Sequence, residues 1–124
     1  MNDQTTTIAE LRRVMNRFVA ARLWRKFHKP KNLAMSLAVE AAELMEHFQW
    51  LTHEQARKLL RKPAARKEIA AEMADVLSFL LSLSAATGID LSAAFESKMA
   101  ANERKYPARL CRGKYQKPRR RVRS

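Results

Sequence analysis

The sequence predicts an all-α protein, a four-helix bundle of the type built from long amphipathic helices, with one additional short helix. Residues that favour helices, chiefly Ala, Leu, Lys, Arg and Glu, dominate the chain, which has only two glycines and four prolines. Apolar residues recur three and four positions apart, and no segment alternates apolar and polar residues as a half-buried strand does. With 47% apolar residues in 124, the chain can bury one modest core.

The first two predicted helices cover residues 5–24 and 33–49, with a break between them. Pro30 disfavours helix at the residue before it, and Asn32 is a suitable N-cap for the second helix. The apolar positions of these helices are Ile8, Leu11, Val14, Met15, Phe18 and Leu23 in the first, and Leu33, Leu37, Leu44, Met45 and Phe48 in the second.

A short helix is predicted over residues 53–61 and a long one over 63–87. Thr52 starts a capping-box pattern before the short helix. Pro63 suits the first turn of the long helix, which is rich in Leu, and Gly88 suits its C-terminal end.

The last predicted helix covers residues 91–105, with Asp90 as its N-cap and Pro107 beyond its end. We therefore expect one helical domain over residues 1–108 and a basic, disordered tail over residues 109–124. The tail holds eight Lys or Arg and no acidic residue, which leaves a net charge of only +5 on the first 108 residues. A solvated extension and a segment that binds polyanions such as nucleic acid both fit this charge.

The remaining composition indicates a soluble, cytoplasmic protein. Cys111 is the only cysteine, so an intrachain disulfide is impossible and a reducing compartment is favoured. The first 20 residues lack the pattern of a signal peptide, and we expect no segment apolar enough to span a membrane.

Two pairs of carboxylates carry the predicted chemistry. Glu40 and Glu43 lie three residues apart on one predicted helix, and Glu72 and Asp75 lie three apart on another, so each pair shares a helix face. Their neighbours are mainly Ala, Leu, Val and Met, and neither helix offers a nearby Lys or Arg. Acids in such surroundings need a neutralising partner. A divalent cation between the two helices would supply it.

The ligand type indicates which ion this is. Four carboxylates without cysteine favour a hard cation, and Mg²⁺ is the usual ion where a triphosphate is bound; Mn²⁺ could substitute for it. Such an ion polarises a phosphoryl group, and a free carboxylate can deprotonate the attacking water. The alternative is that both carboxylate pairs simply face water. An iron-binding bundle would need Glu-x-x-His motifs, which are absent from this sequence.

Aromatic and basic residues form a second group of candidates. Trp24, His28, Trp50 and Phe79 could contact a nucleobase, although packing and surface roles are the ordinary alternatives. Lys98, Asn102 and Lys105 share one face of the last predicted helix and could hold phosphate oxygens, or they could form a solvated stripe.

These residues lie in motifs that resemble a known family. The motif WRKFHKPKNL at residues 24–33 resembles the opening motif of the all-α nucleotide pyrophosphatases, specifically the MazG-like and dCTP pyrophosphatase branch. Four further motifs follow in the family's order: EAAEL at 40–44, FQW at 48–50, EMADVL at 72–77 and KMAANERKYP at 98–107. The resemblance covers roughly residues 8–113.

The resemblance implies hydrolysis of a nucleoside triphosphate, with dCTP or a modified dCTP as one option, to the monophosphate and pyrophosphate. It implies a nucleotide-pool role and a homodimer or a dimer of dimers with sites at subunit contacts. The implied metal ligands and catalytic residues are Glu40, Glu43, Glu72 and Asp75. The predicted substrate contacts are Trp24, His28, Trp50, Phe79, Lys98, Asn102, Lys105 and Tyr106.

Three positions depart from the family's pattern. Val39 replaces the first of two adjacent glutamates of the MazG type, as a non-acidic residue also does in the dCTP-specific branch. Met15 and Phe79 replace a histidine and a tyrosine at positions similar to base-contacting ones, which puts a cytosine preference in doubt. A nucleic-acid-associated helical protein and a non-catalytic nucleotide-binding relative remain the alternatives to an enzyme.

Overall fold

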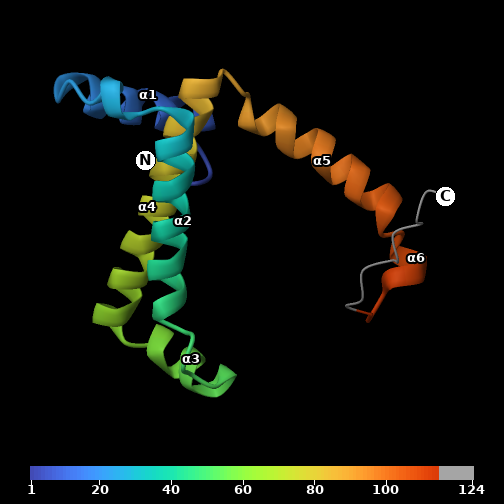
Figure 1. Ribbon diagram of the computed structural model, residues 1–124. Helices are drawn as coiled ribbons and strands as arrows, with labels where there is room; N and C mark the ends of the chain where they lie inside the picture. Colours follow the sequence, from blue (N-terminus) through green and yellow to red (C-terminus); the bar gives the residue numbers. More distant parts are fainter. Residues whose placement is uncertain (115–124) are drawn as a thin grey trace. The chain divides into compact units, whose positions relative to one another are not determined.

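The computed structural model describes residues 1–114, and all regular secondary structure among them is helical, as predicted. The chain forms two compact units, one over Met1–Ile89 and one from Asp90 onward, and each is described by itself. The elements are α1 (Ile8–Ala21), η1 (Arg25–Phe27), α2 (Pro30–Glu46), α3 (His53–Leu60), α4 (Pro63–Thr87), α5 (Leu91–Lys105) and α6 (Ala108–Cys111) (Figure 1).

The first unit is organised around α4. Helix α2 packs along α4 in the antiparallel direction, and α1 and α3 also contact α4 (Figure 1). Its most buried apolar side chains are Val19 from α1, Leu33 from α2, and Ile69 and Leu81 from α4, each at most 5% exposed. Leu33 lies near the start of α2, and Ile69 and Leu81 lie on either side of Glu72 and Asp75 along α4.

Local signals in the sequence determine several helix ends. The Thr52 side chain accepts a hydrogen bond from the Gln55 amide, and the Gln55 side chain accepts one from the Thr52 amide, which completes the predicted capping box. Gly88 ends α4 in the left-handed conformation with φ of 71°, which a residue without Cβ adopts without strain. The Asp90 carboxylate caps α5 by accepting a hydrogen bond from the Ala93 amide.

Other helix ends differ from the prediction. Helix α2 starts at Pro30 rather than at residue 33, because proline is well suited to the first helical position. Asn32 is therefore not the cap; its side-chain amide donates a hydrogen bond to the Phe27 carbonyl at 3.2 Å. Helix α1 starts at a Thr7–Glu10 capping box that was not recognised, and Pro107 precedes an additional helical turn, α6.

The apolar character of α4 differs from the expectation about membrane-spanning segments. We expected no segment long and apolar enough to span a membrane, but within residues 1–114 α4 meets that test by length and composition. The core helix of a soluble protein meets the same test. Helix α4 packs against three neighbouring helices, and 22% of its apolar window of 18 residues is buried. Of the predicted tail, residues 115–124 lie outside the described residues.

Candidate functional site

The structure brings three of the four predicted carboxylates together. Glu40 and Glu43 project from successive turns of α2 and Glu72 from α4, and one carboxylate oxygen of each lies within 4.8 Å of the others. The spacing of three residues on α2 puts both side chains on the face that packs against α4. Asp75 is one turn further along α4, outside this group of three but close enough to act on Glu40 electrostatically.

Within residues 1–114, no Lys or Arg forms an ion pair with this cluster. Oε2 of Glu40 and Oε2 of Glu72 are buried, and no donor among residues 1–114 gives either one a hydrogen bond. A hydrogen bond from the Glu40 carboxyl to Glu43, then burial, then the charges of Glu43, Asp75 and Glu72 raise the pKa of Glu40 from 4.5 to about 7. Unsatisfied buried oxygens and mutual repulsion of this kind are what a bound cation relieves.

His47 is a neighbour of the cluster that was not predicted to be part of the site. Its Nε2 lies 3.9 Å from Oε1 of Glu72, and both side chains are about a quarter exposed. The signal was present in the sequence, because His47 follows Glu43 by four residues and so shares its helix face. Its position puts an imidazole next to the carboxylate of Glu72.

A cavity of about 420 Å³ adjoins the cluster. Glu40 forms part of its wall, and Phe79 from α4, one of the predicted base-contacting residues, lines the same space. The remaining lining residues all come from α2: Asn32, Met35, Ser36 and Val39. A carboxylate and an aromatic ring around one cavity can accommodate both a cation-bound phosphate and an apolar ring.

The structure places the other predicted aromatic residues away from this cavity wall. The Trp24 ring packs edge-on against Phe18, with 5.7 Å between ring centroids, and Trp50 lies in the turn after α2 with 86% of its surface exposed. His28 lines a different cavity, between α1 and α4. The roles assigned to these three residues stay predictions.

The remaining predicted substrate residues belong to the second unit. Lys98, Asn102 and Lys105 lie on α5, with Lys98 and Lys105 exposed, and Tyr106 ends that helix through a hydrogen bond from its amide to the Asn102 carbonyl. The Lys105 Nζ lies 5.3 Å from the centroid of the Tyr106 ring. These four residues are therefore neighbours of one another, and their role in substrate binding stays a prediction.

Known proteins resemble this chain over most of its length. It is 40% identical to human dCTP pyrophosphatase 1 over 111 residues, which is 90% of this chain and 65% of the human protein. It is 38% identical to the bovine dCTP pyrophosphatase 1 over 107 residues. The chain thus spans slightly less than two thirds of the length of these relatives.

A solved structure and a family model agree with these sequence matches. The crystal structure of a pyrophosphatase from Archaeoglobus fulgidus matches with a TM-score of 0.77 and 38% identity, over 86% of this chain and 98% of that one. The model of the MazG-like family matches residues 35–113, which include all four predicted carboxylates. On these matches, the chain belongs to the MazG-like family.

Proposed function

We propose that the protein is a magnesium-dependent nucleoside triphosphate pyrophosphohydrolase that converts a (d)NTP to the monophosphate and pyrophosphate. The observation that carries the proposal is the convergence of Glu40, Glu43 and Glu72 from two helices within 4.8 Å. The relatives named dCTP pyrophosphatase and the pyrophosphatase of similar fold support the same reaction class.

The residues present fit a hard divalent cation. The donors are carboxylate oxygens, two of them buried without a hydrogen-bond donor, and sulfur ligands are absent from the cluster. Glu40, Glu43 and Glu72 would hold the cation, with Asp75 beside them. Bound there, Mg²⁺ or Mn²⁺ would neutralise phosphate charge and polarise the phosphorus–oxygen bond.

The reaction itself needs one water and one proton acceptor. Water adds to one phosphorus of the α–β anhydride, and the bond from that phosphorus to the bridging oxygen breaks. The other phosphate group leaves with the bridging oxygen and its electron pair, which gives the nucleoside monophosphate and pyrophosphate. Asp75 is suited to accept the proton of the water, because it lies outside the group of three carboxylates that would hold the cation. His47 would keep the Glu72 carboxylate oriented during this step.

The substrate class follows from the cavity beside Glu40. Phe79 offers a ring face to a nucleobase but has no hydroxyl group to read its edge. We therefore propose a (d)NTP substrate, dCTP or a modified dCTP among the candidates, with weak discrimination between pyrimidine bases. The reaction would take place in the cytoplasm, where it would remove surplus or non-standard nucleotides.

Exposed apolar residues support a homo-oligomer. Met35 and Val39 on α2 are 59% and 57% exposed, and Met73 on α4 is 58% exposed. An apolar surface on the helices that carry the carboxylates is typical of a subunit interface. We propose a homodimer or a dimer of dimers in which this surface is buried.

A substrate panel tests the proposed activity. Purified full chain is mixed with individual NTPs and dNTPs and Mg²⁺, and pyrophosphate release is measured. Glu72→Gln is expected to lose at least about 100-fold in rate, because it removes a charge from the cluster. Glu68→Gln, one turn earlier on α4 and exposed, is the matched control and should keep full activity. Absence of pyrophosphate release from every nucleotide would refute the proposed function, and full activity of Glu72→Gln would refute the site.

A further inference from the structure

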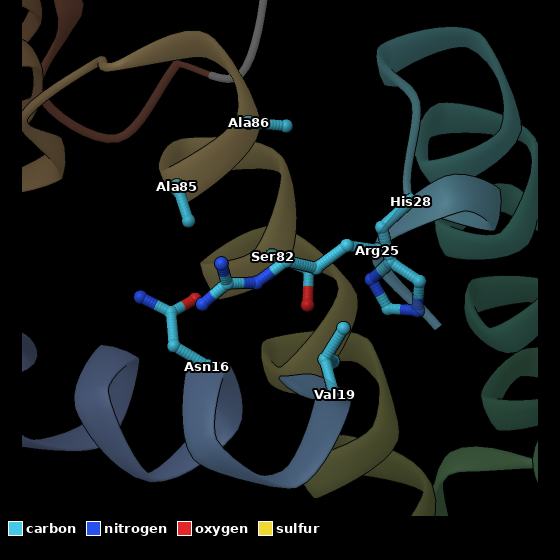
Figure 2. A pocket seen from close by; sticks show the side chains of 7 residues that line it. All are labelled: Asn16, Val19, Arg25, His28, Ser82, Ala85 and Ala86. Atoms are coloured by element: carbon cyan, nitrogen blue, oxygen red, sulfur yellow. The ribbon is translucent and has the colours of Figure 1, made fainter. Parts of the chain in front are cut away.

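A second cavity, separate from the one at Glu40, lies between α1, η1 and the C-terminal part of α4. Its volume is about 300 Å³, at the lower end of the range for small-molecule sites. One part of its lining is polar and comprises Asn16, Arg25, His28 and Ser82, and the other part is apolar (Figure 2). The apolar part consists of Val19, Ala85 and Ala86.

The charge of this lining favours an anion. Arg25 carries a permanent positive charge and has five N–H donors and no acceptor. None of the lining residues is acidic, so no carboxylate in the cavity wall balances that charge. Figure 2 shows the Arg25 side chain extending across the cavity toward Asn16, with His28 on its other side. The cavity therefore presents hydrogen-bond donors and positive charge to whatever occupies it.

Ser82 supplies an independent sign of a missing partner. Its side chain is 5% exposed, and its Oγ has no hydrogen-bond partner among the described residues. Other hydroxyls on α4 are satisfied within the helix: the Ser78 Oγ donates to the Ala74 carbonyl at 2.8 Å. Leaving a buried hydroxyl unpaired costs roughly 1–3 kcal/mol. A ligand oxygen in the cavity would accept the hydrogen bond that the Ser82 hydroxyl donates to no described residue.

We propose that this cavity binds a small organic oxyanion. Its phosphate or carboxylate group accepts hydrogen bonds from Arg25 and Ser82, and its carbon skeleton contacts Val19 and the two alanines. Ser82 follows Asp75 by seven residues, about 10 Å along the helix axis. No carboxylate of the cluster lines this cavity, so the proposal does not depend on the proposed activity there.

The three histidines of the chain allow a direct test. His28 lines the cavity, whereas His47 lies beside Glu72 and His53 starts α3. The metal-stripped full chain in an amine buffer is titrated with propyl phosphate and, separately, with butyrate at constant ionic strength, while proton NMR follows the ring C–H signals. The His28 signal, assigned by its loss in His28→Gln, should shift saturably, and the other two should not. The anion that binds more tightly identifies the head group.

Two variants locate the anion. Arg25→Gln should weaken binding at least about tenfold, whereas Lys26→Gln, which removes the same charge one residue away and outside the cavity, should stay within about twofold. Ser82→Ala should bind more weakly and yet be at least as thermally stable as the wild type without anion, because its unpaired hydroxyl is removed.

Three results would overturn the proposal. The first is a His28 signal that neither anion moves at about 10 mM, a concentration that half-fills even a weak site. The second is an equal shift of all three histidine signals, and the third is equal weakening by Arg25→Gln and Lys26→Gln. The second and third would indicate diffuse attraction to a basic protein.

Discussion

Replacing Glu40 by Gln should change how the stability of the metal-free protein depends on pH. In the folded protein the carboxyl of Glu40 holds its proton more tightly than in the unfolded chain, since its pKa is raised from 4.5 to about 7. The stability from this proton is complete below about pH 4.5 and is lost as the pH rises through 7. Gln resembles the protonated carboxyl at every pH, so Glu40→Gln should remove this loss.

The size of the effect follows from the two pKa values. At pH 6 a carboxyl with a pKa of about 7 is roughly 90% protonated, whereas one at 4.5 is about 3% protonated. Folding then takes up about 0.9 proton, which corresponds to a slope of at most about 1.2 kcal/mol per pH unit. Glu40 is only partly buried, so solvent screening should reduce the measured slope to roughly half of this.

Urea unfolding in the absence of divalent ions between pH 5 and 8 measures the slope. The wild type should lose stability toward pH 8 relative to Glu40→Gln, and the exposed Glu68→Gln should follow the wild type. Saturating Mg²⁺ at pH 8 should make the wild type more stable than Glu40→Gln. An ion at 100 times its dissociation constant adds about 2.7 kcal/mol to the free energy of unfolding of the protein that binds it. Parallel curves for the wild type and Glu40→Gln, with and without Mg²⁺, would refute the electrostatic account of the cluster.

Three further outcomes are expected. His47→Gln should raise the Mg²⁺ concentration for half-maximal activity roughly tenfold, because it releases the neighbouring Glu72; an unchanged Mg²⁺ titration would show that His47 does not orient it. Ile69→Ala should lower the free energy of unfolding by about 2 kcal/mol or more in chemical denaturation, while Ile89→Ala, at a side chain 53% exposed, should change it little. Met73→Lys should shift the mass measured by light scattering toward the monomer if its surface is a subunit interface, and an unchanged mass would locate the interface elsewhere.

Local sequence signals predicted most of the fold because they act within a few residues. Gly88 and Asp90 each end or start a helix where the sequence indicated. The predicted start of α2 was wrong because Pro30 and Asn32, two residues apart, both favour a helix start. Pro30, which fits the first helical position, determines where α2 begins. The turn after Pro107 was missed because a four-residue helix leaves almost no periodic pattern.

For the candidate site, the sequence predicts which side chains share a helix face but not which residues of two different helices meet. The i, i+3 spacing put Glu40 beside Glu43, and the apolar neighbours indicated that both faced a partner helix. Which residues of α4 meet them depends on the axial offset between the two helices, which no local pattern encodes. The position of His47 opposite Glu72 and the cavity around Arg25 are therefore visible only in three dimensions.

Asn32 connects the two cavities. Its side chain lines the space at Glu40, and the same side chain holds the Phe27 carbonyl at the end of η1, the segment that carries Arg25 into the other space. An occupant that contacts Arg25 would thereby act, through η1 and Asn32, on the wall of the cavity at Glu40. Thermodynamic linkage requires this influence to be mutual, so a nucleotide and an oxyanion would each alter the affinity of the other by the same factor.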